Sequence, residues 1–265
     1  SWESVFVKDP FNAERIQNVT FSGTVRLGLF NGVARERCGL PLMHGIKNAH
    51  IHNCTIADNV TITDITGFIA NYDIGEGVVI RNCGHISTEG HTSFGNGTRV
   101  AVLNETGGRE VPIWDRLTSH MAYIITLYRH RPSAIAEIEK LIDDYAESVK
   151  SDRGEIGSGS YIAGCGTIKN VRIGNGAVIE DVSRLAEGSV NSSFRDPVYI
   201  GNDVIMDHFI ICSGSKVNDA AVIDKCFIGQ GCTLSKQYSA ENSLFFSNCG
   251  GYHGEACSIF AGPFT

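Results

Sequence analysis

The sequence predicts a mainly β protein in which a parallel β-solenoid carries an inserted α-helical hairpin, and two observations predict it. The first is a large apolar residue at every sixth position between Ile56 and Ile86, with polar or glycine-containing spacers between. A six-residue period fits neither an amphipathic helix, with apolar residues at threes and fours, nor a single strand with strict alternation. The second is a stretch of helical periodicity that separates two runs of this repeat. The repeated residues of the first run are Ile56, Ile62, Phe68, Ile74, Ile80 and Ile86.

Each hexad is expected to form one short strand and one bend. The aliphatic side chain points inward, and a neighbouring Gly, Asn or Asp tolerates the positive φ, or makes the local hydrogen bonds, that bends need. One hexad cannot bury its apolar residue alone, so stacked coils form the core. Hexads return after the interruption, together with shortened steps. They run over 156–162, 173–179, 200–206, 217–223 and 228–234, and five-residue steps span 51–56, 168–173 and 223–228.

The Ile-Gly-x-x-Val-x-Ile spacing at 74–80 resembles that of the bacterial hexapeptide-repeat transferases. This resemblance implies a left-handed parallel β-helix with three hexads per turn. It also implies an acyl-CoA-dependent acyltransferase that acts on a sugar or amine acceptor. Acyl-CoA would be a co-substrate in the groove between two solenoids of a homo-oligomer, with a trimer favoured.

The N-terminal part divides into a lead-in with a first coil, over 1–45, and a first stretch of β-helix, over 46–99. Residues 19–29 alternate well enough for strands of that first coil, and Asn31-Gly32 marks a turn. Residues 35–44 are expected to form an irregular loop before the hexads begin.

A helical hairpin is predicted over 100–155. Its first helix begins at Pro112, and its second begins at Pro132 and ends near Lys150, Arg153 and Gly154. We expect the hairpin to pack against the solenoid or another subunit, because such apolar stripes are more often core than ligand site; a lid is the alternative. The predicted stripes are Ile113, Leu117, Met121, Ile124 and Tyr128, then Ile135, Ile138, Leu141, Ile142, Tyr145 and Val149.

The β-helix is predicted to resume over 156–238, with a loop at 191–197. Beyond that, 239–265 is either irregular or a continuing solenoid. Its apolar, uncapped end favours a chain that continues further, because solenoid ends normally need a polar cap. This tail, 151–154 and 107–111 also resemble one uncharacterised family of large hexapeptide-repeat proteins from gut anaerobes, a domain of unknown function that implies no assigned activity.

Charge and composition exclude several classes of function. The net charge of −7, from 22 Lys and Arg against 29 Asp and Glu with no basic run, argues against nucleic-acid binding and against an anionic membrane surface. No apolar stretch approaches the ~20 residues that span a bilayer. We therefore expect a soluble, cytoplasmic protein whose nine cysteines are mostly small packed thiols.

His208 is one candidate general base. The segment 197–208 resembles in part the Pro-Val-x-Ile-Gly-x-x-Val segment of hexapeptide acyltransferases, many of which place a histidine near a subunit groove. Imidazole suits the role because it titrates near neutrality. The alternative is a corner histidine that bonds a backbone carbonyl.

His253 is the second candidate. Glycines near it give the backbone freedom, and Glu255 is placed to orient it as carboxylates orient catalytic histidines elsewhere. Lys236, Gln237 and Asn248 supply polar groups on the same segment and are predicted to bind substrate; an interface is the alternative.

No metal site is predicted. There is no Cys-x-x-Cys pair, and no third ligand is evident beside His50 and His52. His85 and His91 are one hexad apart, which places them on adjacent faces of the solenoid. Two further functions stay open beside acyl transfer. One is the accessory solenoid of a sugar-nucleotide transferase, and the other is a non-catalytic scaffold or binding solenoid.

Overall fold

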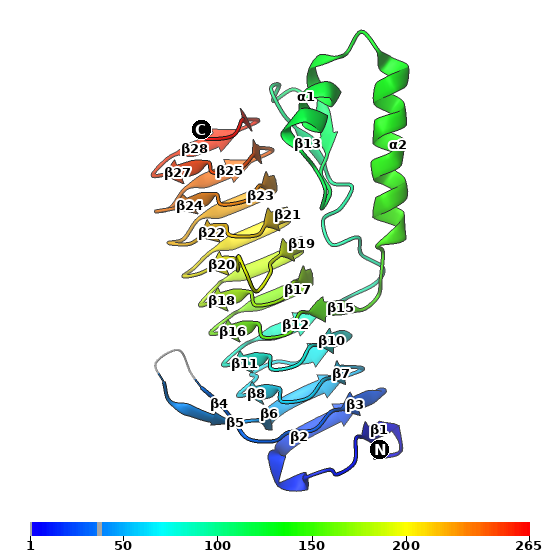
Figure 1. Ribbon diagram of the computed structural model, residues 1–265, viewed down its shortest axis with the longest axis vertical. Coiled ribbons are helices and arrows are strands. Elements are labelled where there is room, and N and C mark those ends of the chain that lie inside the picture. Colours follow the sequence, from blue (N-terminus) through cyan, green and yellow to red (C-terminus); the bar gives the residue numbers. More distant parts are fainter. Residues whose placement is uncertain (1, 36–38) are drawn as a thin grey trace.

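The computed structural model describes residues 2–35 and 39–265 and shows a tall stack of short strands with a helical arm along its upper half (Figure 1). Within these residues the fold is mainly β, with one 25-stranded parallel sheet, two small antiparallel pairs and two α-helices. No helix in the described residues is long and apolar enough to cross a membrane.

Consecutive coils stack in parallel register, and each coil carries three strand positions. Ile56 lies beside Ile74, and Ile162 lies beside Ile179, so one coil spans about three hexads, as predicted. We call the three stacks the first, second and third faces. The first face holds β8 (Thr61–Thr63), β11 (Val79–Arg81), β16 (Tyr161–Ala163), β18 (Val178–Glu180), β20 (Tyr199–Ile200), β22 (Lys216–Val217), β24 (Thr233–Ser235) and β27 (Gly250–Tyr252).

The other two faces follow along the chain, and several long strands bend from one face to the next. The second face holds β9 (Ile69–Ala70), β12 (His85–Ser87), β25 (Ser239–Glu241) and β28 (Glu255–Cys257). The third holds β1 (Val5–Val7), β3 (Val25–Leu27), β7 (Thr55–Ile56), β10 (Tyr72–Ile74), β15 (Gly154–Ile156), β26 (Leu244–Phe245) and β29 (Phe260–Ala261). The strands β2 (Ile16–Ser22) and β6 (Gly45–His52) turn from first to second face, and β17 (Thr167–Ile173), β19 (Arg184–Asn191), β21 (Ile205–Cys212) and β23 (Val222–Ile228) turn from second to third.

Asparagines at the corners hold successive coils together. Asn18, Asn48, Asn53 and Asn71 all have positive φ, which Asn tolerates better than most residues. The side chain of Asn18 donates to Asn48 at 3.0 Å, and Asn53 donates to Asn71 at 2.9 Å. The asparagines of the repeat therefore both adopt the backbone conformation of the bends and hydrogen-bond one coil to the next.

Aliphatic side chains fill the interior, as the repeat predicts, with one exception. Phe68 was expected inside but is exposed, because Ile69 takes the inward position between Ile51 and Ile86. The ring of Phe68 instead packs edge-on against His85 at 4.9 Å. The cysteines within the repeat are buried and unpaired, as predicted: Cys54, Cys83, Cys165, Cys226 and Cys232.

Part of the irregular loop predicted over 35–44 is instead a strand. The strands β4 (Val33–Arg35) and β5 (Pro41–Met43) pair as an antiparallel hairpin on the first coil, and part of the predicted loop, 36–38, lies outside the described residues. Two short 3₁₀ helices, Trp2–Ser4 and Ala13–Arg15, belong to the N-terminal segment. At the other end, 239–265 continues the solenoid in register, with Ala240 beside Ala256.

The helical insertion departs from the solenoid after Ser87 and rejoins it at Gly154, whereas the sequence placed it at 100–155. We call 88–153 the arm. It holds an antiparallel pair, β13 (Arg99–Ala101) and β14 (Glu110–Pro112), followed by α1 (Ser119–Leu127) and α2 (Pro132–Ser148).

The first helix is shorter than predicted, and the second buries a different set of residues. The first starts after Thr118, whose hydroxyl accepts from the Met121 amide at 3.2 Å, so Ile113 and Leu117 precede it. In α2, Pro132 begins the helix as predicted, but Leu141 is 53% exposed and Ala146 is buried in its place. The buried residues of the helices are those that face the solenoid, and they do not follow one regular helical stripe.

Candidate functional site

The outward side chains of the third face change character along the stack. Strand register aligns them in one column, from Asp73 through Glu155 and Arg172 to the apolar half that begins at Ile210. The polar half is Arg26, Thr55, Asp73, Glu155, Arg172 and Ser189, and the apolar half is Ile210, Phe227, Leu244 and Phe260.

The arm covers the apolar half. Ile113 and Ile125 of the arm form one buried cluster with Ile210, Phe227 and Leu244 of the solenoid, each at most 2% exposed. Trp114 also belongs to this cluster and packs edge-on against Tyr145, with ring centroids 5.1 Å apart. The apolar residues of the arm are thus used for packing within the chain.

A half-buried carboxylate fixes the arm where the two halves meet. Asp115 forms an ion pair with Arg172 and accepts hydrogen bonds from Asn191 at 2.9 Å and from the Tyr145 hydroxyl at 2.9 Å. Burial, and then the Asp115 carboxylate, raise the pKa of Tyr145. Two of the donors come from the solenoid and one from the arm, so this cluster locks the arm to the third face.

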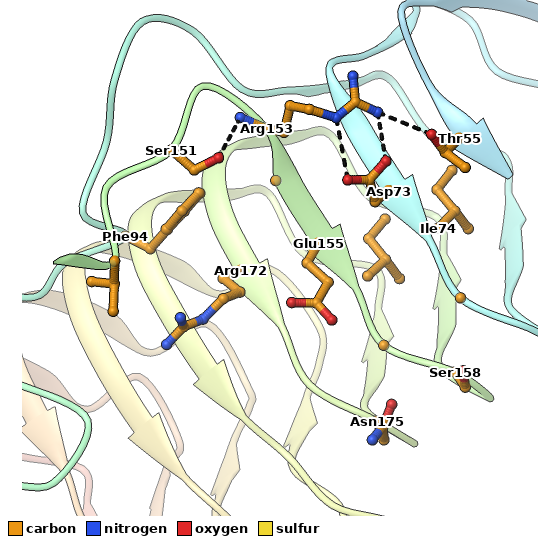
Figure 2. A pocket seen from close by; sticks show the side chains of 15 residues that line it. Thr55, Asp73, Ile74, Phe94, Ser151, Arg153, Glu155, Ser158, Arg172 and Asn175 are labelled. Carbon is orange, nitrogen blue, oxygen red and sulfur yellow. Dashed lines mark hydrogen bonds and ion pairs between the residues drawn. The ribbon is translucent and has the colours of Figure 1, made fainter. Parts of the chain in front are cut away.

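A cleft opens below that lock, at the point where the arm joins the solenoid (Figure 2). We call it the root cleft; its volume is about 510 Å³. Strands β10, β15 and β17 bring charged side chains to it, and the arm contributes Phe94 and Val149. Its lining is Thr55, Asp73, Ile74, Gly75, Phe94, Val149, Ser151, Arg153, Gly154, Glu155, Ile156, Gly157, Ser158, Arg172 and Asn175.

Arg153 forms one wall of the root cleft. Its guanidinium contacts Asp73 at 2.5 and 3.2 Å and donates to the Asn53 carbonyl at 3.0 Å and the Thr55 hydroxyl at 3.3 Å. Burial alone would raise the pKa of Asp73, but the hydrogen bonds from Arg153 and Thr55 outweigh it and hold that pKa below its usual value. The prediction that Arg153 ends the second helix is therefore wrong; it anchors the end of the arm.

Glu155 is the carboxylate of the root cleft that is available to bind a ligand. Its side chain is exposed and has no hydrogen bond or ion pair with any described residue. In Figure 2 it lies between the Asp73–Arg153 pair and Arg172, on the strand β15 that follows the arm. Asp73 and Arg172, in contrast, are both engaged in ion pairs. A free carboxylate accepts hydrogen bonds from hydroxyl or ammonium groups.

His208 lies at a corner between the second and third faces, with a positive φ of 48°. Within residues 2–35 and 39–265 it pairs with carboxylates, and no hydrogen bond to a backbone carbonyl is found. Its Nδ1 is 3.1 Å from Asp207 and 3.6 Å from Asp224, and Asp207 is also paired with Arg184. It does not line the root cleft.

His253 lies at another corner, between the first and second faces. Both His253 and Glu255 are exposed, and no hydrogen bond joins them in the described residues, so the structure does not orient His253 through Glu255. Lys236 lies close by, with its ammonium 5.8 Å from the centre of the Tyr252 ring.

The predicted substrate-binding residues do not meet at one place. Gln237 follows Lys236 at the same corner as His253, and its backbone N–H donates to the backbone carbonyl of Asp219 at 2.7 Å. Asn248 lies at the third corner, where its backbone N–H donates to the backbone carbonyl of Gln230 at 2.8 Å. The histidines and these polar residues are therefore spread over all three corners.

Sequence reasoning missed the root cleft. Its signal was a charged residue at the outward position of successive strands, Asp73, Glu155 and Arg172, but the arm separates the first from the other two in the sequence. Within the described residues, no group of three His, Cys, Asp or Glu side chains is arranged to hold a metal ion. His50 and His52 both line a shallow hollow on the second face with Phe68.

Comparison with known sequences places the chain in a family. The family model described as "Domain of unknown function (DUF4954)" matches residues 1–265. The chain belongs to this family. One relative, an uncharacterized protein of Treponema pallidum (strain Nichols), is 27% identical to this chain over 228 residues. That match covers 82% of this chain and 31% of the relative, so the chain spans less than a third of that protein's length.

Proposed function

We propose that this chain is a left-handed parallel β-helix of hexapeptide-repeat type, and that it binds the acceptor substrate of an acyl transfer in the root cleft. The handedness and the acyl-CoA donor rest on the resemblance of the Ile-Gly-x-x-Val-x-Ile repeat. Coils of three hexads with Asn, Asp and Gly at positive φ at their corners support the same family. A homotrimer rests on the same resemblance, and a cytoplasmic location rests on the packed, unpaired cysteines.

Glu155 carries the proposal. It is an unpaired carboxylate beside two arginines that are already neutralised by Asp73 and Asp115. The root cleft is therefore polar without being a strong anion site, which favours a neutral sugar hydroxyl or an amine over a phosphate. A carboxylate within hydrogen-bond reach of such a group can also remove its proton as it attacks an acyl carbonyl.

In this step the acceptor oxygen or nitrogen bonds to the thioester carbonyl carbon, the bond from that carbon to sulfur breaks, and CoA leaves as the thiol. Glu155 receives the acceptor proton and passes it on to the leaving thiolate. His253 and His208 are the competing bases. Neither lines the root cleft, and each would need an acceptor bound at another corner.

The test is ligand binding and turnover on the purified chain. Thermal unfolding is followed with acetyl-CoA, amino sugars and nucleotide sugars, since a ligand at a hundred times its dissociation constant stabilises the folded state by about 2.7 kcal/mol. Glu155→Gln should lose the acceptor-dependent shift and the acetyl transfer. The matched control Glu137→Gln removes an exposed carboxylate of α2 outside the root cleft and should change neither.

Other outcomes would assign the function elsewhere. Loss of transfer in His253→Ala or His208→Ala, with Glu155→Gln active, would contradict the role of Glu155 and favour a histidine base. A shift with nucleotide sugars alone would favour the accessory solenoid of a sugar-nucleotide transferase. No response to any ligand would favour a scaffold.

A further inference from the structure

A second hollow lies near the N-terminal end of the stack, between the first face and the hairpin of β4 and β5 that projects from it (Figure 1). We call it the hairpin pocket; its volume is about 570 Å³. It is remote from the root cleft in the fold, and the two share no lining residue. Its lining is Asn12, Glu14, Arg15, Gln17, Pro41, Leu42, Met43, His44, Gly45, Ile46, Lys47, Thr63, Asp64 and Arg81.

Gly45 helps to make room for the hairpin pocket. The hairpin rejoins the solenoid at this residue, whose φ is +143°, and its backbone lines the pocket. A Cβ at this position would lie 2.3 Å from the carbonyl oxygen of Arg15, so a side chain cannot be added without moving the backbone. The close approach of these two segments brings Arg15 against the start of β6.

Three cationic side chains line the hairpin pocket. Lys47 and Arg81 occupy outward positions of the first face with Thr63 between them, so they lie two strands apart. At the usual strand spacing this separates their backbones by about 10 Å. Arg15 lines the pocket beside Gly45, and the Lys47 ammonium has no ion-pair or hydrogen-bond partner in the described residues.

The local charge is opposite to that of the whole chain. The carboxylates in the lining are Glu14 and Asp64, and Asp64 already accepts a hydrogen bond from Asn48 at 2.6 Å. Burial, and then the positive charge of Arg15, lower the pKa of His44. A site with more cations than carboxylates in a chain of net charge −7 attracts anions.

The opposite wall is apolar. Pro41, Leu42 and Met43 of β5 line it, and Met43 is 59% exposed. A cationic floor beside an apolar wall fits a ligand with one charged end and one apolar end. Arg and Lys side chains bind phosphate oxygens through charge-assisted hydrogen bonds.

We infer that the hairpin pocket binds a phosphate ester with an apolar substituent, its phosphate held by Arg15, Lys47 and Arg81 and its substituent against β5. The site is separate from the proposed acceptor site, and it stands whether or not the chain transfers acyl groups. Thr63 adds a hydroxyl donor between two of the cations.

Isothermal titration of the purified chain tests the inference, with phenyl phosphate, inorganic phosphate and phenol as probes. Phenyl phosphate should bind more tightly than inorganic phosphate, and phenol should not bind. Lys47→Glu should weaken phenyl phosphate binding by about tenfold or more, since hydrogen bonds to charged groups contribute roughly 1.5–3 kcal/mol. Lys216→Glu, the same change on the same face but outside the pocket, should leave it within about twofold.

Three results would overturn the inference: no saturable binding of phenyl phosphate by the folded wild type, equal weakening by the two lysine variants, or equal binding of phenol. Circular dichroism establishes that both variants are folded. As a further check, Glu155→Gln should leave phenyl phosphate binding unchanged, so that failure here is distinguishable from failure of the acceptor site.

Discussion

The lower and upper halves of the third face are successive strands of one parallel stack in continuous register, yet their outward side chains differ completely. In the lower half Asp73 and Glu155 face solvent or the root cleft, whereas in the upper half Phe227 and Leu244 are buried under the arm. The backbone repeat does not impose this difference, because outward positions of a solenoid carry no packing requirement of their own. The outward side chains of the third face are therefore apolar where the arm covers them and polar where it does not.

The comparison also explains why a cleft forms where it does. The arm leaves the solenoid after β12, and its apolar cluster covers strands from β21 upward, so β15 and β17 lie between its attachment and its apolar docking surface. Asp115 and Arg172 mark the border. A cleft at such a border has one rigid wall and one wall that depends on the docking of the arm.

The largest effect is expected from Phe227→Ala, which removes a buried ring at the centre of the covered half. We expect the free energy of unfolding to fall by about 3 to 5 kcal/mol, as for other Phe-to-Ala changes in cores. Trp114 reports on the arm: in a Trp2→Phe background its emission should shift to longer wavelength as the buried indole becomes wet. An unchanged emission and stability would show that the arm does not depend on this contact.

A smaller loss is expected from Arg172→Met, which leaves Asp115 with its hydroxyl and amide donors but without its cation. Removal of one partner of a fully buried ion pair costs 3–5 kcal/mol, so for this partly exposed pair we expect about 2 kcal/mol in urea unfolding. Asp115→Asn in the Arg172→Met background should then cost little. Additive losses in this double-mutant cycle would contradict a direct pair.

Low pH should destabilise mainly the polar half of the third face, which the arm leaves uncovered. The pKa of Asp73 is lower in the folded chain than in the unfolded chain, so its contribution is complete above about pH 4 and is lost as the pH falls through the folded value. Because Asp73 is half exposed, we expect less than about 1 kcal/mol. Urea unfolding of the wild type and of Asp73→Asn from pH 6 to pH 3 should converge at the acidic end, and parallel curves would contradict this assignment.

The smallest effect is expected from Glu155→Leu, which places an apolar residue in the same column but on the open half. No arm residue packs on it as one packs on Phe227, so the free energy of unfolding should change by less than about 0.5 kcal/mol. Chemical denaturation measures it. A stabilisation of more than 1 kcal/mol would mean that the arm reaches further down the face than the structure shows.

The six-residue period predicted a mainly β solenoid because each inward position must be filled by an apolar residue, and the coil length of three hexads came from the resemblance to hexapeptide-repeat transferases. The period failed at Phe68, where a seven-residue step makes Ile69 the inward residue. The second helix was predicted from Pro132, but the first was extended too far, because Ile113 packs from beside a strand and carries the same apolar signal as a helical residue.

The candidate site was less accessible to sequence reasoning. Asp73 and Glu155 are neighbours in space only because the arm is looped out between them, and no local pattern encodes that register. His208 was proposed from a partial motif resemblance, and His253 from its glycine neighbours and Glu255. The structure leaves His253 exposed and places His208 among carboxylates, and it brings neither to the root cleft.

The arm precedes in the chain the strands that it covers, and this fixes an order of events during synthesis. At the usual 5–20 residues per second, Phe260 is made roughly 5 to 20 s after the end of the arm leaves the ribosome's catalytic centre. Until then Ile113 and Ile125 have no complete surface to cover. The nascent chain therefore exposes an apolar, aggregation-prone helical segment for seconds. How long it stays exposed depends on how fast the later coils fold against it.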